Sequence, residues 1–286
     1  MSSTADKDVA ILDTAASSSC DADTERRFGG LARLYGAAGA SQIRKACVMV
    51  VGIGGVGSWT AEALARSGVG RLVLVDMDHV SESNVNRQIH ALSSTLGMAK
   101  VSAMQQRIRE INPECDVTAI DEFVDAENWS GLIHPGVHGI VDACDQMAAK
   151  FEMARWARSS ARGASTHFIC VGAAGGKLRA NALDIDDLAN TTHDPLLAQL
   201  RARLRRHAGA PRDGKRIGIT CVFSREAVAK PVTAGGAPVD SSLNCHGYGS
   251  TVAVTASFGM AAAGWILERL SAAPRKQGAN AEGTTL

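Results

Sequence analysis

Several short segments of this sequence carry residue types that suit the binding of a phosphorylated ligand. The first is Gly52-Ile53-Gly54-Gly55-Val56-Gly57, which follows an apolar, β-branched run and opens an Ala- and Leu-rich helical pattern. Gly52 suits a tight turn, Gly54 the approach of backbone to phosphate, and Gly57 the close packing of helix on strand. Amides at the start of such a helix bind anions, and an acid after the second strand, Asp76, suits ribose hydroxyls. These features predict a nucleotide site without separating NAD from ATP.

Three further residues favour ATP over a nicotinamide cofactor. Arg87 and Lys100 are cations that suit the charge developing on pyrophosphate as it leaves, and Asp145 suits a divalent cation, Mg²⁺, held against the phosphates. Each has a simpler interpretation as a solvated lysine, a helix cap or, for Asn84 and Asn86, a turn residue. The ATP site therefore rests on co-occurrence, and its predicted ligands are Gly52, Gly54, Gly55, Gly57, Asp76, Asp78, Asn84, Arg87, Gln88, Lys100 and Asp145.

Apolar runs alternate with helical patterns, which predicts an α/β fold with a Rossmann-like, mostly parallel sheet and helices on both faces. Strands are expected at Ala46–Val51, Arg71–Asp76, Asp116–Ile120, Gly139–Ala143 and Thr166–Val171. Helices are expected at Ser58–Ser67, Lys100–Ile111 and near Ala148–Ser159. Because open sheets bind ligands beyond the carboxyl ends of their strands, the site residues are expected to meet there.

The pattern changes after Gly172, where Lys177–Asp184 and Lys215–Phe223 are typical of strands without clear crossover helices. We therefore expect antiparallel strands to extend the sheet in the C-terminal part. Residues 27–272 are expected to form one domain, with a nucleotide-binding half at about 40–172 and a substrate-binding half at about 173–272. Residues 1–26 and 273–286 are expected to be disordered tails, and the Gly- and Pro-rich residues 227–249 a long mobile loop.

The composition favours a cytoplasmic protein. The seven cysteines are scattered without a Cys-x-x-Cys pair, so neither a disulfide framework nor a structural zinc site is expected. A formal charge of +1 and 4% aromatic residues give no chain-wide signal for nucleic acid. The start of the chain has no signal-peptide pattern. Gly247–Leu267 is uncharged but only weakly hydrophobic, so membrane association there is disfavoured against a buried helix.

On these motifs, residues 27–272 resemble the superfamily of ubiquitin-activating-enzyme-like (ThiF/MoeB-type) adenylating proteins. The shared pattern is Gly-x-Gly-Gly-x-Gly, Asp-x-Asp, Asn-x-x-Arg-Gln, a Lys and an Asp, and this chain has every part of it. Other segments resemble a narrower family, the tRNA threonylcarbamoyladenosine dehydratases. These segments are Arg27–Gly36, Asn86–Leu92, Ile111–Cys115, Asp194–Leu196 and Cys221–Ser224.

The resemblance implies an ATP-dependent enzyme that forms an acyl-adenylate on the threonyl carboxylate, after which the carbamoyl group closes a ring and AMP leaves, with net loss of water. It implies ATP and Mg²⁺ as cofactors and Arg87, Lys100 and Asp145 as catalytic residues. The implied partners are tRNA carrying threonylcarbamoyladenosine next to the anticodon, a second copy of the chain in a homodimer, and a cysteine desulfurase or sulfur-acceptor system.

A one-sided basic cluster is the candidate RNA site. Only Asp213 opposes it within its span, so it can neutralise phosphates in an otherwise near-neutral protein. The alternative is a solvated, charged helix end. The cluster consists of Arg201, Arg203, Arg205, Arg206, Arg212, Lys215 and Arg216.

Two roles that the resemblance raises are left open. Cys245 adjoins His246, which favours its thiolate and suggests an accessory catalytic role, against an unreactive loop thiol as the alternative. Relatives also insert an arginine from the partner subunit into the ATP site. The matching position here holds Gly30, and Arg27 or Arg33 are the candidates to replace it.

Three other functions compete with the dehydratase interpretation. The first is adenylation of the C-terminus of a ubiquitin-like sulfur-carrier protein, which the missing Cys-x-x-Cys pairs disfavour. The second is an NAD-dependent oxidoreductase. The third is a non-catalytic nucleotide-binding scaffold, which the presence of Arg87, Lys100 and Asp145 disfavours.

Overall fold

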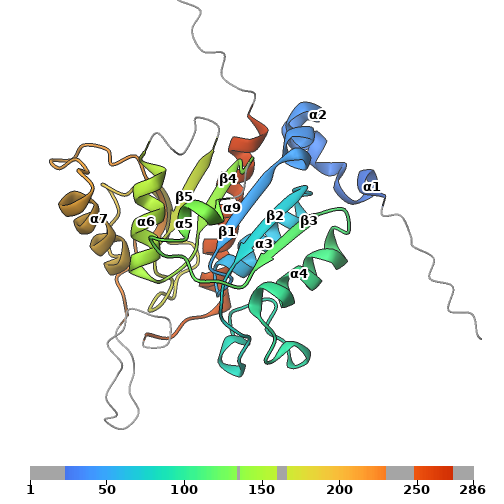
Figure 1. The fold of residues 1–286 in the computed structure, drawn as a ribbon, viewed down its shortest axis with the longest axis horizontal. Coiled ribbons are helices and arrows are strands. Elements are labelled where there is room, and N and C mark those ends of the chain that lie inside the picture. The colour runs from blue at the N-terminus through green and yellow to red at the C-terminus, as the bar shows by residue number, and fades with distance from the viewer. Residues whose placement is uncertain (1–22, 134–135, 160–165, 230–247, 273–286) are drawn as a thin grey trace, which may run out of the picture.

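The computed structural model describes residues 23–133, 136–159, 166–229 and 248–272 (Figure 1). Within these ranges, the centre is a seven-stranded sheet with the order β3-β2-β1-β4-β5-β7-β6. Neighbouring strands pair in parallel except β6, which is antiparallel to β7. Chain order reverses between β1 and β4, the position where open α/β sheets bind ligands. The strands are β1 Cys47–Val51, β2 Arg71–Val75, β3 Asp116–Ile120, β4 Gly139–Asp142, β5 His167–Val171, β6 Leu183–Asp187 and β7 Thr220–Ser224.

The central strands are buried on both faces, which explains their continuous apolar sequences. Along β1, Val48 and Val50 enter one hydrophobic core, whereas Met49 and Val51 enter the other. Helices cover both faces of the sheet (Figure 1), and their apolar side chains complete the two cores. One face is covered by α2 Gly30–Lys45, α3 Gly57–Arg66, α4 Lys100–Ile111 and α9 Val252–Ser271, and the other by α5 Trp129–Leu132, α6 Met147–Ala157 and α7 Pro195–His207.

The predicted fold class is confirmed, with corrections in the C-terminal part. β7 extends the parallel sheet beside β5, so among the described strands only the edge strand β6 is antiparallel. The strand expected at Lys177–Asp184 begins only at Leu183, because the amides of Leu178 and Arg179 donate to the Glu226 carboxylate instead of a neighbouring strand.

The strand expected at Lys215–Phe223 is also shorter, since β7 begins at Thr220. The amides of Ile217 and Gly218 both donate to the buried Asp187 carboxylate at 2.8 Å. Gly218 has φ of +85°, a left-handed conformation that does not continue a strand. In both segments a carboxylate takes the backbone donors that a strand would offer to its neighbour.

Most of the uncharged segment at residues 247–267 belongs to helix α9. Val254, Phe258, Ala262 and Ile266 lie on its buried face and pack into the core below the sheet. At Gly259 an added Cβ would lie 2.6 Å from the carbonyl oxygen of Val56, so this glycine allows α9 to approach α3 closely. In the described ranges, no helix has both the length and the hydropathy needed to cross a membrane.

The expected domain edges fall near the limits of the described residues. Helix α1, Thr24–Phe28, begins three residues before the boundary expected at residue 27 and carries a capping bond from Arg26 N to Asp23 Oδ1. Residues 1–22, 273–286 and most of the loop expected at 227–249 lie outside the described part of the chain. Two short 3₁₀ turns, η1 Glu82–Asn84 and η2 Ser93–Thr95, precede α4.

Candidate ATP site

The glycine segment forms a sharp loop between β1 and α3. Gly52 has φ of +86° and its amide donates to Val75 O at 2.8 Å, which ties the loop to β2. An added Cβ at Gly57 would lie only 1.7 Å from the Gly52 carbonyl oxygen, so this glycine is required for loop closure. A Cβ at Gly54 would meet no atom of the protein within 4 Å, because the residue borders a cavity.

The two acids after β2 have different partners, because Asp76 bonds the glycine loop and Asp78 pairs with Lys100. Asp76 Oδ2 accepts the Ile53 amide at 2.6 Å and its Oδ1 accepts the Asp78 amide at 2.8 Å. Burial raises the pKa of Asp76, an effect that Lys100 and these two amides oppose. Asp78 instead pairs with Lys100, Oδ2 to Nζ, at 2.6 Å.

The two predicted cations are buried against the cavity. Lys100, the first residue of α4, is 6% exposed, which argues against a solvated lysine. Arg87 is 8% exposed and its Nη1 donates to Ser83 O at 2.5 Å and to Asn86 Oδ1 at 3.0 Å. Since these partners are neutral, the guanidinium keeps its full charge for a ligand.

The neighbouring amide side chains differ in how many of their polar atoms remain free to bind a ligand. Asn84 lines the cavity and its Oδ1 accepts the Ser81 amide at 3.0 Å, so it also shapes a turn. Asn86 Nδ2 donates to Ser250 O at 3.1 Å, which ties this segment to the residues just before α9. Gln88 is 5% exposed and lines the cavity, and its Oε1 has no hydrogen-bond partner among the described residues. Gln88 is therefore the amide best placed to bind a ligand.

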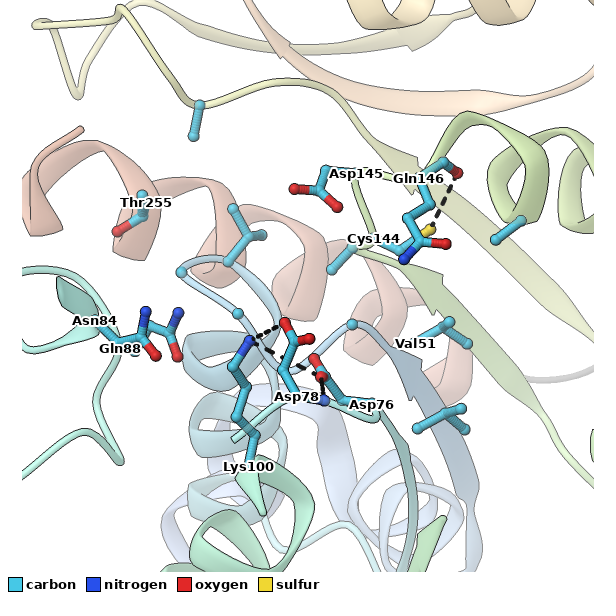
Figure 2. Close-up of a pocket in the computed structure, with 18 of the residues that line it drawn as sticks. Val51, Asp76, Asp78, Asn84, Gln88, Lys100, Cys144, Asp145, Gln146 and Thr255 are labelled. Atoms are coloured by element: carbon cyan, nitrogen blue, oxygen red, sulfur yellow. Dashed lines mark hydrogen bonds and ion pairs between the residues drawn. The ribbon is translucent and has the colours of Figure 1, made fainter. Parts of the chain in front are cut away.

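Asp145 lies across the cavity from Lys100, in the segment between β4 and α6 (Figure 2). The residue at the N-cap position of α6 is Gln146, and no side chain caps this helix, so the capping role is not observed. The Asp145 carboxylate is exposed and has no hydrogen bond or ion pair within the described ranges. Free carboxylate oxygens suit Mg²⁺, a hard cation that keeps several waters and binds through few protein ligands.

The cavity that these residues line measures about 380 Å³, and Figure 2 shows them converging on it from several elements. The structure brings every predicted ATP-site residue from Gly52 to Asp145 to the lining of this cavity except Gly57, which packs against the Gly52 carbonyl. Sequence reasoning missed Phe123, Val124, Cys144, Gln146, Ala173, Leu196 and Thr255.

Some of the missed residues had a readable signal. Phe123 and Val124 follow β3, and Ala173 follows β5, at the carboxyl ends where ligands are expected. Thr255 had no such signal because it reaches the site from α9, where its hydroxyl donates to Arg87 O at 3.3 Å.

In the basic cluster, two arginines donate hydrogen bonds to groups of the protein, whereas the other cations are exposed to solvent. The Arg201 guanidinium donates to Leu188 O, Thr191 O and Thr191 Oγ1 at 2.8–3.0 Å, and Arg205 donates to Pro211 O at 3.1 Å. Arg216 is exposed and 3.8 Å from Asp187. The exposed members that have no acidic partner in the described part of the chain are Arg203, Arg206, Arg212 and Lys215.

Of the two candidate arginines near the N-terminus, Arg27 lies far from the cavity of its own chain. Arg27 Nη1 donates to Ile111 O at 2.8 Å, at the C-terminal end of α4, whereas Lys100 begins that helix. A 12-residue helix spans roughly 17 Å, so Arg27 is about that far from Lys100. Arg33 is exposed on α2. Cys245 lies outside the described residues.

The Rossmann-like sheet, the glycine loop and the cationic cavity define an adenylating fold, and the model of the ThiF family matches residues 28–282. The chain is 40% identical over 262 residues to the tRNA threonylcarbamoyladenosine dehydratase of Escherichia coli K12, covering 88% of this chain and 96% of that protein. It belongs to the tRNA threonylcarbamoyladenosine dehydratases of the ThiF family.

A solved structure agrees with this assignment. The structure of the E. coli tRNA N6-threonylcarbamoyladenosine dehydratase in complex with ATP matches with a TM-score of 0.78 and 40% identity, covering 87% of this chain and 96% of that one. A more limited similarity, 32% identity over 117 residues, relates 41% of this chain to 25% of the adenylyltransferase and sulfurtransferase MOCS3 of Drosophila willistoni.

Proposed function

We infer that this chain is an ATP-dependent enzyme that cyclises the threonylcarbamoyl group of threonylcarbamoyladenosine in tRNA, next to the anticodon. The observation that carries this function is the cavity, which buried Arg87 and Lys100 line together with the glycine loop, and in which Lys100 lies across from Asp145 (Figure 2). A relative of 40% identity has a structure in complex with ATP. Cations at this place suit a leaving pyrophosphate, for which a nicotinamide enzyme has no need.

The reaction proceeds in two balanced steps. A threonyl carboxylate oxygen bonds to the α-phosphorus of ATP, and the bond to pyrophosphate breaks. The carbamoyl group then bonds to the activated carbonyl carbon, AMP leaves, and a proton is released, so that the substrate has lost one water in total. The second step is intramolecular, and proximity makes an external nucleophile unnecessary.

We propose that the charged residues of the cavity serve the first step. Arg87 and Lys100 stabilise charge on the phosphates, while the glycine loop offers backbone amides from Gly54 onward. Asp145 is the residue to hold Mg²⁺, which would supply further positive charge at the phosphates. Asp76 shapes the loop through the Ile53 amide and borders the place where a ribose would lie.

The RNA surface proposed for this enzyme is the exposed part of the basic cluster at the end of α7. Arg203, Arg206, Arg212 and Lys215 have side chains free to meet phosphates, while Arg201 and Arg205 already bond backbone carbonyls. A surface of this kind binds RNA with a strong dependence on salt.

A homodimer would bring a second arginine to the cavity. Arg27 lies too far from the ATP site of its own chain, so it would act only across a dimer interface. Arg27 is committed to the end of α4, and the exposed Arg33 is therefore the better candidate. We make three further proposals. Residues 27–272 form one catalytic unit, Cys245 has an accessory role, and the enzyme works with a sulfur-transfer partner.

The decisive experiment is mass spectrometry of tRNA nucleosides after incubation with the enzyme, ATP and Mg²⁺. The threonylcarbamoyl nucleoside is expected to lose the mass of one water, with AMP formed in equal amount. Failure to form AMP with threonylcarbamoylated tRNA would refute the proposal. The sulfur-carrier alternative instead predicts pyrophosphate exchange only when a carrier with a Gly-Gly C-terminus is added.

A further inference from the structure

Lys150 on α6 is a charged side chain buried completely beneath the wall of the cavity. Its Nζ lies 2.8 Å from Asp142 Oδ2, 2.9 Å from Val171 O and 3.4 Å from Cys170 Sγ. Both Lys150 and Asp142 are 0% exposed. One ammonium group therefore joins the end of β4, the end of β5 and helix α6.

The chemistry of this pair argues for more than stability. Burying two charges costs free energy that their attraction only partly returns, and apolar residues of similar volume often replace such pairs without loss. Burial lowers the pKa of Lys150, but the Asp142 carboxylate, together with the neighbouring Cys170 and Cys144, outweighs this effect and raises the pKa above its usual value. The ammonium thus stays charged at neutral pH, at a cost that needs another explanation.

The two neighbouring strand ends that Lys150 joins both continue into segments that line the ATP cavity. Beyond Asp142 the chain runs through Cys144 to Asp145, and Asp142 Oδ1 accepts both the amide of Cys144, at 3.3 Å, and its thiol, at 3.1 Å. Beyond Val171 the chain forms the wall at residues 172–174, where the Ala173 amide donates to Asp194 Oδ2 at 2.9 Å. Neither Lys150 nor Asp142 is among the described residues that line the cavity.

We propose that Lys150 and Asp142 are positioning residues for adenylation, because they fix the Asp145 segment relative to the wall at residues 172–174. The inference rests on the proposed function, since it assumes that Asp145 holds the cation on ATP. Without the pair, the Asp145 carboxylate keeps its chemistry but loses its fixed place. Arg87, Lys100 and the glycine loop lie on other elements and still bind the nucleotide.

The test compares two double variants that each remove one buried carboxylate together with a cation that pairs with it. Asp142→Asn/Lys150→Met leaves no unpaired buried charge and keeps an acceptor for the Cys144 amide. The matched control, Glu62→Gln/Arg107→Met, removes the 2% exposed Glu62 carboxylate and its partner on α4, a pair of 2.7 Å that lies away from the cavity. The second partner of Glu62, Arg66, has an exposed side chain and stays solvated. Circular dichroism and thermal unfolding show whether both fold.

The measurements separate positioning from stability. For Asp142→Asn/Lys150→Met we expect kcat for AMP formation to fall about 100-fold, with a KM for ATP within about threefold of wild type. The Mg²⁺ concentration that half-saturates binding of a non-hydrolysable ATP analogue should rise about tenfold. The control should stay within about twofold of wild type in all three.

Three results would overturn the inference: a folded variant with wild-type kcat, an unchanged Mg²⁺ requirement, or an equal loss in the control. If the double variant does not fold, the same measurements are made on Lys150→Arg. This variant keeps the positive charge but changes its position, so the Mg²⁺ requirement should rise. If wild-type enzyme forms no AMP on tRNA, the proposed function fails, whereas analogue binding still decides the inference.

Discussion

Single charged side chains at this site owe their properties to what surrounds them. Arg87 and Lys100 are both almost fully buried, yet the partners of Arg87 are a carbonyl and an amide, whereas Lys100 faces the carboxylate of Asp78. Arg87 is thus a cation without an acidic partner among the described residues, and Lys100 a cation held in place by one. The two can stabilise a phosphate in different ways.

Removing either cation should slow adenylation much more than it weakens folding. For Arg87→Met and Lys100→Met we expect AMP formation to fall about 10²–10³-fold, as for the loss of one donor to a developing charge. Rapid-quench measurement of pyrophosphate release gives the rate. Arg109→Met, on the exposed face of α4, serves as the control and should keep the wild-type rate. Unchanged rates in both test variants would remove these residues from the mechanism.

His90 makes stability depend on pH. It is 1% exposed, neither ring nitrogen has a partner among the described residues, and burial, with help from Lys100 and Arg107, lowers its pKa from 6.5 to about 4. Between pH 6.5 and 4 the unfolded state binds a proton that the folded state does not, so stability falls as pH falls through this window. The full loss is roughly 3 kcal/mol.

Urea unfolding at pH 7 and pH 4.5 checks this expectation. His90→Leu removes the titrating group, so its stability should fall less than that of wild type by roughly 2–3 kcal/mol over this range. His79→Gln, which changes an exposed histidine, should follow wild type. Parallel pH dependence in wild type and His90→Leu would contradict the buried neutral imidazole.

Among the elements, the loop between β1 and α3 separates structural glycines from binding glycines. For Gly57→Ala the new methyl group would lie 1.7 Å from Gly52 O, so we expect the loop to deform and the melting temperature to fall. Gly54→Ala meets no protein atom within 4 Å and should keep the wild-type melting temperature.

Gly54→Ala should weaken ATP binding although it leaves the folded protein intact. Its methyl group would project into the cavity, so ATP affinity should fall at least tenfold in a fully folded protein, measured by calorimetry. If Gly54→Ala binds ATP as wild type does, the nucleotide does not approach the backbone at this loop.

On the scale of the whole molecule, the exposed cations in the last turns of α7 and just after it extend the proposed binding surface past the cavity. Arg203→Glu/Arg206→Glu should weaken tRNA binding at least tenfold and reduce its salt dependence, while ATP binding stays unchanged. Filter binding at several salt concentrations measures both. Arg109→Glu/Arg155→Glu reverses two charges elsewhere and should have a smaller effect. Equal losses in the two variants would indicate only a general electrostatic attraction.

The fold itself was largely readable from local pattern. Helix α4 and strand β3 have the predicted bounds, since Asn112-Pro113 ends the helix and an apolar, β-branched run defines the strand. The bounds of β6 were not readable, because Glu226, far along the chain, takes the amides of Leu178 and Arg179. No local pattern reports a competitor that distant in sequence.

The sequence by itself determined the phosphate loop, the order of the strands along the chain and the cations of the site, because glycine spacing and hydrophobic period are local properties. Only the tertiary structure decided that Lys100 is buried, that Arg201 bonds carbonyls, that Thr255 reaches the site from α9, and that Lys150 joins two strand ends. These depend on which distant segments pack together, and packing sets the solvation and the partners that give a side chain its chemistry.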